Sequence, residues 1–224
     1  MTIKLCGFSA SNYYNQTKLQ LLEKQVPFEQ EMVLTGGTGS VGLRLLGGSP
    51  MGKVPFLDTG RGCISESIAC AEYIEAAYPQ HPLLPSDAYA AGKVRELVLY
   101  IELHLELVAR ELYAEAFFGG KVSDAVKERS RKLLVKGAAA FAKIARFSPY
   151  VAGDQFTLAD CAAIVHLPVV ASASKLIYGE DLLAALPVKD YLRVVGDRPA
   201  VRRVNEDRKA DTQRMLATQA ASRK

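Results

Sequence analysis

A proline-rich segment divides this sequence into two halves with different residue patterns. Residues 78–87 read Tyr-Pro-Gln-His-Pro-Leu-Leu-Pro-Ser-Asp, with three prolines within seven residues. Proline has no backbone N–H to donate and disfavours helix in the residue before it, so this segment must be an extended connection. The sequence therefore predicts a first domain at 1–79, a linker at 80–87 and a second domain at 88–224, each of ordinary size.

The half before the linker mixes strand and helix patterns. In chain order we expect a strand, a helix and a strand, then a two-strand hairpin and a helix: Ile3–Phe8, Asn12–Gln25, Phe28–Leu34, Pro55–Asp58, Arg61–Ser65 and Ser67–Ala77. An irregular stretch at 35–53 separates the two groups. This order is the one found in thioredoxin-like folds, so we predict an α/β thioredoxin-like N-terminal domain.

The half after the linker is dominated by helical periodicity. Apolar residues three and four positions apart form a stripe on one long helix: Leu97, Ile101, Leu105, Val108 and Leu112. Further helices are expected over Val122–Phe147, from near Thr157, over Glu180–Leu186 and over Pro199–Leu216. The second domain is therefore predicted to be all-α.

Charge and hydropathy exclude two classes of partner. The net charge is only +4, and the basic cluster Arg198–Arg214 also carries Glu206, Asp207 and Asp211. Such a mixture is typical of a solvated helix face, so no nucleic-acid partner is expected. The longest apolar stretch, Cys161–Ala173, is interrupted by a histidine and a proline. It is shorter than the roughly 20 residues of a membrane-spanning helix, so no membrane partner is expected.

The cysteines and histidines show no metal-ligand spacing. The four cysteines are far apart and form no CxxC pair, and the three histidines form no ligand motif. A polar run from Ser9 to Lys18 replaces the apolar core of a signal peptide. We therefore expect reduced thiols in a cytoplasmic protein without a metal.

A glycine-rich motif follows the second predicted strand. Residues 37–42 read Gly-Thr-Gly-Ser-Val-Gly, which matches the GxGxxG pattern of dinucleotide-binding proteins, with Asp58 downstream. That fold needs a helix of ten or more residues opening at the glycines, and only Val41–Leu46 remains before Gly47 and Gly48. We interpret the motif as a glycine-rich connection at the rim of a site.

Two short segments carry binding chemistry. Glu66 and Ser67 stand at the start of the predicted helix Ser67–Ala77. A helix N-terminus attracts carboxylates, and the acid beside it can hold an ammonium, so the pair suits the head group of an α-amino acid. The alternative is that Ser67 only caps the helix. Upstream, Val54 and Pro55 stand at the start of a strand, where proline marks an edge or a sharp bend.

These segments resemble a known family. Ser-Pro-Met-Gly-Lys-Val-Pro-Phe-Leu-Asp at 49–58 and Ile-Ser-Glu-Ser-Ile-Ala at 64–69 are similar to the glutathione-binding half of the glutathione transferases. Gly153–Asp160 and Arg198–Val201 resemble later elements of that family, so the resemblance covers nearly the whole chain. It implies a homodimer with a thioredoxin-like domain and an all-helical domain, glutathione as co-substrate and a small electrophile as second substrate.

The resemblance also implies residue roles. Glu66 and Ser67 would bind the amino and carboxylate groups of the γ-glutamyl unit. The Val54 backbone, before a cis Pro55, would pair with the cysteinyl unit, and Lys53 would lie near the glycyl carboxylate. The loop at 35–48 lacks the basic or amide side chain that many relatives place there against the glycyl carboxylate, which favours a non-catalytic module; Arg44 is a candidate substitute. In the second domain, Thr157 and Asp160 form a capping-box-like helix start with a role in folding.

Chemistry requires the glutathione thiolate, because the thiol is a poor nucleophile. Aligning Thr17–Leu22 with the helix of serine-type relatives puts Ser11 at the activating position; Ser9 and Asn12 are one or two places away, and Tyr13 or Tyr14 can reach the site. The alternative is that Ser11 merely caps the helix. Cys6 lies inside the strand, which argues against a cysteine-type mechanism. Candidates for contact with the second substrate are Tyr100, His104, Glu111 and Tyr113.

The predicted function is therefore a glutathione transferase. A first alternative is a non-catalytic interaction module on the same fold, although its N-terminal site would typically be degraded. A second alternative is a glutathione-dependent isomerase. Its helix-start motif usually carries paired serines and a cysteine, which Ser11, Asn12 and Tyr13 do not match.

Overall fold

The computed structural model describes residues 2–36 and 39–222. Packing divides the chain into two compact units: unit 1 comprises Met1–Leu83 and Asp197–Lys224, and unit 2 comprises Leu84–Gly196. In this division the last helix of the chain packs with the first half, whereas the prediction of a second domain at 88–224 groups that helix with the helical half. That helix carries polar side chains that pair with the first helix, and sequence periodicity does not report such contacts.

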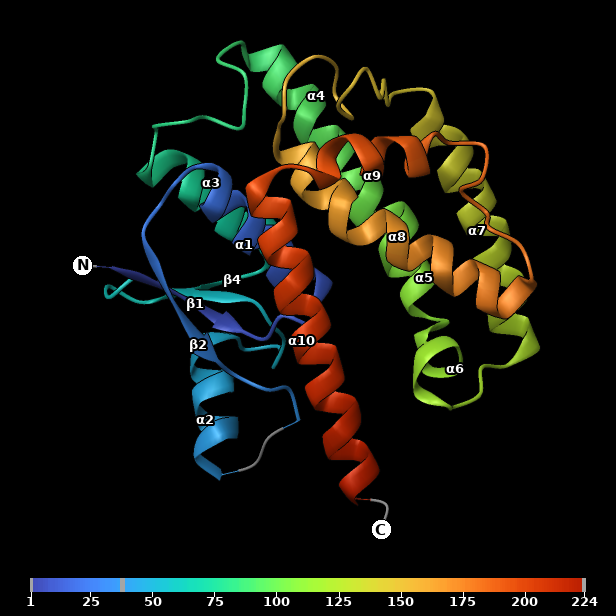
Figure 1. The fold of residues 1–224 in the computed structure, drawn as a ribbon, viewed down its shortest axis with the longest axis horizontal. Helices are drawn as coiled ribbons and strands as arrows, with labels where there is room; N and C mark the ends of the chain where they lie inside the picture. Colours follow the sequence, from blue (N-terminus) through green and yellow to red (C-terminus); the bar gives the residue numbers. More distant parts are fainter. Residues whose placement is uncertain (1, 37–38, 223–224) are drawn as a thin grey trace. The chain divides into compact units, whose positions relative to one another are not determined.

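Unit 1 contains a four-stranded sheet and four helices among its described residues (Figure 1). In chain order these are β1 (Ile3–Gly7), α1 (Asn12–Glu23), β2 (Phe28–Met32), α2 (Gly39–Gly48), β3 (Phe56–Asp58), β4 (Cys63–Ser65), α3 (Ser67–Ala77) and α10 (Pro199–Ser222). The strand order is β2-β1-β3-β4. β1 is parallel to β2 and antiparallel to β3, and β3 is antiparallel to β4. β1 and β4 therefore run in the same direction.

Alternation along the strands gives the sheet two apolar faces. On one face, Ile3 and Leu5 of β1 pack with buried side chains of α1 and α3. On the other face, Cys6 and Phe56 pack with Leu45 of α2. Helices thus cover both faces of the sheet, as Figure 1 shows, and the predicted thioredoxin-like arrangement is confirmed.

The stretch at 35–53 is more regular than the sequence suggested. Gly37 and Thr38 of the glycine motif lie outside the described residues, and the rest of the motif opens the ten-residue helix α2. A dinucleotide-binding unit continues into a parallel strand, whereas the strand after α2 is antiparallel to β1. Gly48 has a packing role, since a Cβ there would lie 2.1 Å from the Phe56 ring. α2 approaches the sheet closely because of this glycine.

Unit 2 is helical. Its elements are α4 (Ala88–Leu99), the π-helix η1 (Tyr100–Glu106), α5 (Leu107–Arg110), α6 (Tyr113–Phe118), α7 (Asp124–Ala142), α8 (Leu158–Tyr178) and α9 (Val188–Gly196). The prediction of a helix at Glu180–Leu186 is wrong. That segment forms only short turns, because Gly179 ends α8 in the left-handed conformation and the proline at 187 disfavours helix before it. α9 begins directly after this proline.

A π-helical segment interrupts the predicted long helix. Buried residues recur every four positions along it, at Leu97, Ile101, Leu105 and Ala109. A spacing of four exceeds the 3.6 residues of an α-helical turn, and the wider winding of η1 keeps these side chains on one face. Helix α7 crosses here at Gly137, where a Cβ would lie 2.5 Å from the His104 carbonyl oxygen.

α8 is longer than the apolar run that marks it in the sequence. It continues through Pro168 over 21 residues, and among the described residues it is the one helix long and apolar enough to cross a membrane by length and composition. The expectation that no segment reaches this length is therefore wrong. However, 56% of its most apolar window is buried inside the protein, as in a core helix.

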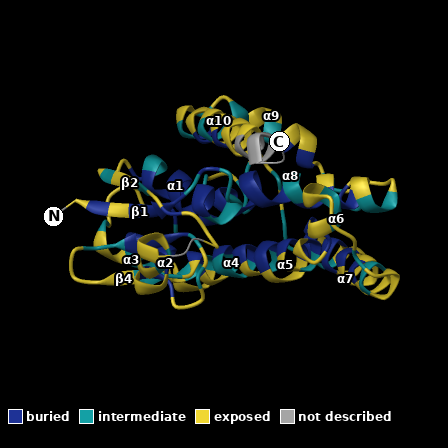
Figure 2. Ribbon diagram, turned by 90° about the horizontal axis from the view of Figure 1, so that it is seen from below, coloured by how far each residue is buried: buried dark blue, intermediate teal, exposed yellow. Residues whose placement is uncertain are grey.

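Figure 2 shows that burial differs along the chain, with α1 mostly buried and α10 mostly exposed.

Candidate functional site

Strand register brings three predicted site segments to one edge of the sheet. Cys6 lies opposite Phe56, and Phe56 lies opposite Ser65. The next row at this edge is therefore Gly7, Pro55 and Glu66, with adjacent strands about 4.8 Å apart. Because β1 and β4 run in the same direction, α1 and α3 both begin here. Their N-termini direct backbone N–H groups toward this edge.

Ser11 is the N-cap of α1. Its hydroxyl oxygen accepts a hydrogen bond from the Tyr14 backbone N–H at 3.4 Å, so it does have the capping role. A hydroxyl that accepts one bond keeps its own proton to donate, so capping does not exclude a bond to a ligand atom. Ser9 is buried, and its carbonyl accepts from the Asn15 side chain at 2.8 Å. The turn from β1 into α1 is therefore held by its own polar groups.

The neighbouring tyrosines differ from expectation. Tyr14 is 2% exposed, belongs to the core beneath the sheet, and donates its hydroxyl to Gln30 at 3.0 Å. Burial raises the pKa of this phenol well above its usual value. The expectation that Tyr14 can reach the site is therefore wrong, because its ring packs inward. Tyr13 and Asn12 are half-buried at the start of α1.

Val54 lies beside the end of β1. The peptide bond between Val54 and Pro55 is cis, as the resemblance implied. Val54 precedes β3 and lies outside the ladder between β3 and β1. A Cβ at Gly7 would lie 3.1 Å from the Val54 Cβ, so the absence of a side chain at Gly7 permits this approach. Lys53 is exposed, and its backbone N–H donates to the Ser49 hydroxyl at 3.2 Å.

Glu66 and Ser67 occupy the start of α3. Glu66 has φ 70° and ψ 127°, and few residues other than glycine adopt a positive φ. It is the N-cap residue, yet its carboxylate makes no capping hydrogen bond, and the side chain is exposed. Ser67 is buried at the first helical position. It is therefore not the N-cap residue, as the alternative that Ser67 only caps the helix would require. The unused carboxylate beside a helix N-terminus suits an ammonium and carboxylate pair.

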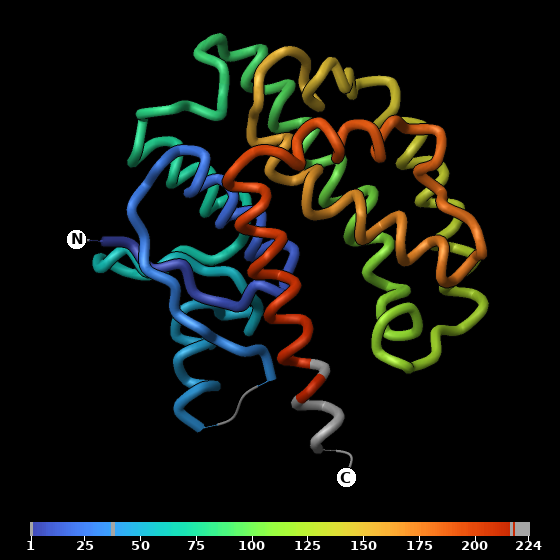
Figure 3. Tube along the Cα trace, in the orientation of Figure 1, coloured from blue at the N-terminus to red at the C-terminus, as the bar shows by residue number. Residues whose placement is uncertain are grey.

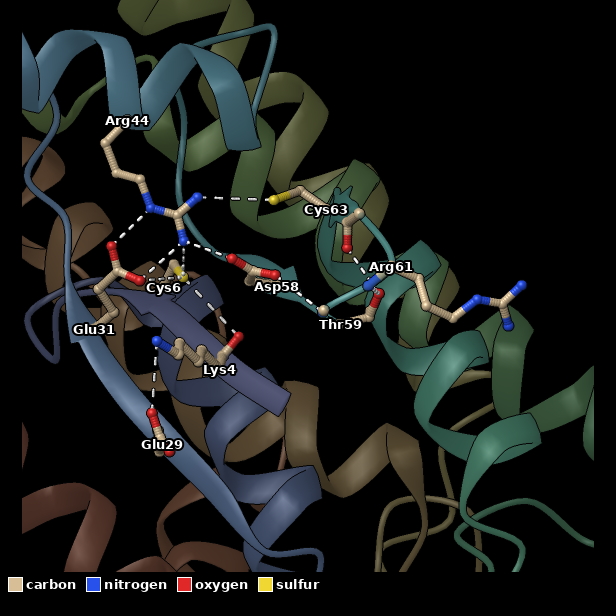
Figure 4. Close-up of polar contacts among 11 residues, drawn as sticks. Lys4, Cys6, Glu29, Glu31, Arg44, Asp58, Thr59, Arg61 and Cys63 are labelled. Carbon is tan, nitrogen blue, oxygen red and sulfur yellow. Dashed lines mark hydrogen bonds and ion pairs between the residues drawn. The ribbon is translucent and has the colours of Figure 1, made fainter. Parts of the chain in front are cut away.

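Arg44 does not substitute for the missing glycyl-carboxylate ligand. Its guanidinium donates to Glu31 at 2.7 Å and to Asp58 at 3.0 Å (Figure 4). It also donates to the sulfur atoms of Cys6 at 3.4 Å and Cys63 at 3.8 Å. These contacts hold Arg44 against the strands that α2 covers. The candidate substitute Arg44 is thus already paired with two carboxylates, one from β2 and one from β3.

Cys6, one of the two cysteines that Arg44 contacts, is unsuited to act as a nucleophile. Cys6 is fully buried, and burial together with the charge of Glu31 raises the pKa of its thiol to about 12. This agrees with the expectation that Cys6 is not a nucleophile.

Among residues 2–36 and 39–222, no group of three His, Cys, Asp or Glu side chains is arranged to hold a metal ion.

The four candidates in unit 2 have identifiable partners within that unit. Tyr100 and His104 form an edge-to-face ring pair with centroids 5.0 Å apart. Glu111 pairs with Arg129 at the surface. Tyr113 is buried and donates its hydroxyl to Glu106 at 3.1 Å.

One residue at the site was missed. Asp211 on α10 was interpreted as part of a solvated helix face, yet it is 8% exposed. Its carboxylate accepts a hydrogen bond from the Ser9 backbone N–H at 2.6 Å. The two residues are 202 positions apart, and no local pattern signals such a contact.

Comparison with known proteins identifies the family. The model of the glutathione S-transferase N-terminal domain matches residues 5–82, and that of the C-terminal domain matches residues 124–194. A glutathione S-transferase of Pseudomonas putida is 43% identical over 209 residues, covering 93% of each chain. A maleylpyruvate isomerase of Ralstonia is 30% identical over 180 residues, covering 77% of this chain and 83% of the relative.

Solved structures agree on the fold. A glutathione S-transferase of Methylobacterium radiotolerans, in complex with glutathione sulfonate, superposes with a TM-score of 0.74 at 23% identity. The match covers 91% of this chain and 94% of that one. The two matching domain models and the relative of nearly full coverage show that the chain belongs to the glutathione S-transferase family.

Proposed function

We propose that this glutathione transferase binds its co-substrate at the sheet edge where α1 and α3 begin. Glu66 receives the γ-glutamyl ammonium, and Ser67 with the α3 N-terminus receives the adjacent carboxylate. The Val54 backbone pairs with the cysteinyl unit, and Lys53 neutralises the glycyl carboxylate. The observation that carries this proposal is the row Gly7, Pro55 and Glu66, which the strand register brings to one edge.

Ser11 is the proposed activating residue. Its O–H donates a hydrogen bond to the sulfur, and the positive end of the α1 dipole favours the thiolate over the thiol. The thiol proton passes to solvent, and the sulfur forms a bond to an electrophilic carbon. In a substitution the leaving group departs with its electron pair. In a Michael addition the neighbouring carbon takes up a proton.

Calorimetric titration with glutathione tests the site, and steady-state kinetics with a chlorodinitrobenzene test the reaction. The Ser11→Ala variant is expected to retain glutathione affinity and to lose most turnover. Absence of binding at millimolar glutathione would sink both the site and the mechanism. Turnover that survives in the variant would transfer the activating role to Ser9 or Asn12. Binding without any turnover in the wild type would favour the non-catalytic alternative.

An isomerase is the second candidate, because a maleylpyruvate isomerase is among the relatives. Both reactions begin with attack of the glutathione thiolate on an unsaturated or activated carbon. They differ in outcome, since an isomerase releases glutathione again after a cis–trans rotation. Following maleylpyruvate and glutathione together separates the two: isomerisation without loss of glutathione supports the isomerase.

A homodimer in a cytoplasmic compartment is part of the proposal. Exposed leucines recur every four residues on unit 2, at Leu99, Leu103 and Leu107. Such a row is the kind of surface that a second copy covers. The cysteines at 6, 63, 70 and 161 form no disulfide, which suits a reducing compartment. Sedimentation of the wild type and of Leu103→Glu tests the interface: the wild type is expected to sediment as a dimer and the variant as a monomer.

A further inference from the structure

The C-terminal helix holds the turn that carries Ser11. Asp211 accepts the Ser9 N–H at 2.6 Å, and the Asn15 side chain donates to the Ser9 carbonyl at 2.8 Å. Both polar groups of the Ser9 backbone are thus bound, one from α10 and one from α1. Ser9 and Asp211 are both buried. Because a hydrogen bond to a carboxylate is roughly twice as strong as a neutral one, Asp211 is the stronger of the two anchors.

Two further ion pairs set the position of α10 along α1. Lys18, whose side chain is 1% exposed, contacts Asp207 at 2.6 Å. Arg198 contacts Glu23 near the other end of α1 at 2.5 Å. Asp207 and Asp211 are four residues apart, so they lie on the same face of α10. Figure 3 shows α10 running beside α1.

We propose that Asp211 is a positioning residue for thiol activation. It fixes the Ser9 peptide, and through it the hydroxyl of Ser11 two residues later. Small displacements of a catalytic group are costly, because a misplacement of about 1 Å lowers rates by up to about 100-fold. The negative charge of Asp211 is balanced by Arg214 at 2.6 Å. This inference rests on the proposed site at the start of α1.

Three variants test the inference. Asp211→Ala removes the acceptor, Asp211→Asn keeps an amide oxygen as acceptor, and Asp207→Asn weakens the docking of α10 without touching Ser9. Each is measured for kcat, for glutathione affinity by calorimetry, and for the pKa of the bound thiol by thiolate absorbance against pH. Melting temperature reports on folding.

Asp211→Ala is expected to lower kcat on the order of 10-fold and to raise the pKa of the bound thiol, with glutathione affinity changed less than about 2-fold. Asp211→Asn is expected to recover most of kcat. Asp207→Asn is expected to lower the melting temperature and leave the pKa of the bound thiol unchanged. An unchanged kcat and thiol pKa in Asp211→Ala overturns the inference. Equal losses of kcat in Asp207→Asn and Asp211→Ala overturn it too. If Asp211→Ala does not fold, the inference is tested by comparing kcat and the pKa of the bound thiol between Asp211→Asn and Asp207→Asn.

The Ser11→Ala variant separates this inference from the proposed function. If Ser11→Ala loses turnover and Asp211→Ala does not, only the positioning role of Asp211 fails. If Ser11→Ala keeps turnover and Asp211→Ala loses it, the turn is confirmed as the active element and Ser11 is replaced as its donor. In a Ser11→Ala background, Asp211→Ala is expected to cause no further loss of kcat, since both act through one hydrogen bond.

Discussion

Glu66 is an exposed acid in a backbone conformation that few residues other than glycine adopt. Holding a non-glycine residue in such a region costs about 1–3 kcal/mol, and such residues cluster at binding sites. Its side chain makes no capping bond that would repay this cost within the helix. The residue in this conformation stands in the same row of the sheet edge as Gly7 and Pro55.

Replacing Glu66 by Gln tests its role directly. The amide cannot neutralise an ammonium, so Glu66→Gln is expected to weaken glutathione binding about 10-fold or more, which corresponds to about 1.4 kcal/mol. Calorimetric titration measures the change. Glu29→Gln is the matched control, because Glu29 is an exposed acid on β2 away from this edge. Equal affinities of Glu66→Gln and the wild type would remove Glu66 from the site.

Two thiols beside Arg44 are expected to differ in reactivity. Cys63 is exposed, whereas Cys6 is buried with its thiol pKa raised to about 12. At about pH 8 iodoacetamide is therefore expected to modify Cys63 in the native protein and Cys6 only after unfolding, because the thiolate is the reacting form. Mass spectrometry of the peptides measures both rates. Comparable native rates at the two positions would contradict the buried environment of Cys6.

Among the elements, the start of α8 depends on one buried carboxylate. Asp160 accepts from the Thr157 N–H at 2.8 Å, from the Val151 N–H at 3.0 Å and from the Tyr191 hydroxyl at 2.9 Å. With Thr157 it forms the capping box that the sequence indicated. The third bond reaches α9, so this residue joins two helices to the preceding loop.

Asp160→Ala is expected to lower the free energy of unfolding by about 3–5 kcal/mol, because it leaves several buried donors without an acceptor. Urea unfolding followed by circular dichroism measures the change. Asp190→Ala serves as the control: Asp190 is exposed and pairs only at the surface with Arg193, so its loss should cost at most about 1 kcal/mol. A similar small loss for Asp160→Ala would mean that the capping box is dispensable.

At the scale of the whole molecule, each unit is built around buried polar groups as well as apolar ones. In unit 1, Lys18 of α1 pairs with Asp207 of α10, and Arg198, directly before α10, pairs with Glu23 of α1. In unit 2, His166 of α8 is fully buried, and burial lowers its pKa to about 4 despite the charge of Glu106. The folded protein therefore keeps this imidazole neutral over a range of pH in which an unfolded chain would protonate it.

This difference predicts a pH dependence of stability. Between about pH 6.5 and pH 4 the unfolded His166 binds a proton and the folded one does not, so the free energy of unfolding falls with decreasing pH, by up to about 1.4 kcal/mol per unit. His166→Asn is expected to remove this component of the slope. His81→Asn, at an exposed position, is expected to keep it. Urea unfolding at about pH 7, 6 and 5 measures the free energy of unfolding against pH. Parallel slopes for the wild type and His166→Asn would contradict the prediction.

Local patterns in the sequence by themselves determine much of unit 1. The bounds of α3 agree at both ends with those predicted, and Glu66 stands directly before it, because helix starts and apolar periodicity are properties of neighbouring residues. The proline-rich segment likewise separates a sheet-containing half from a helical half. The roles of Ser11, Lys53, Val54, Glu66 and Ser67 toward glutathione remain predictions.

Contacts between residues far apart in the sequence determined the features that local patterns did not. Arg44 lies 13 residues from Glu31 and 14 from Asp58, and only the folded sheet and α2 bring their charges together. Tyr14 points inward because its ring packs in the core and its hydroxyl donates a hydrogen bond to Gln30. α10 joins unit 1 because Asp207 and Asp211 meet Lys18 and Ser9 across nearly the whole chain. Periodicity shows which face of a helix is apolar, but ion pairs and strand register depend on partners that only the tertiary structure brings close.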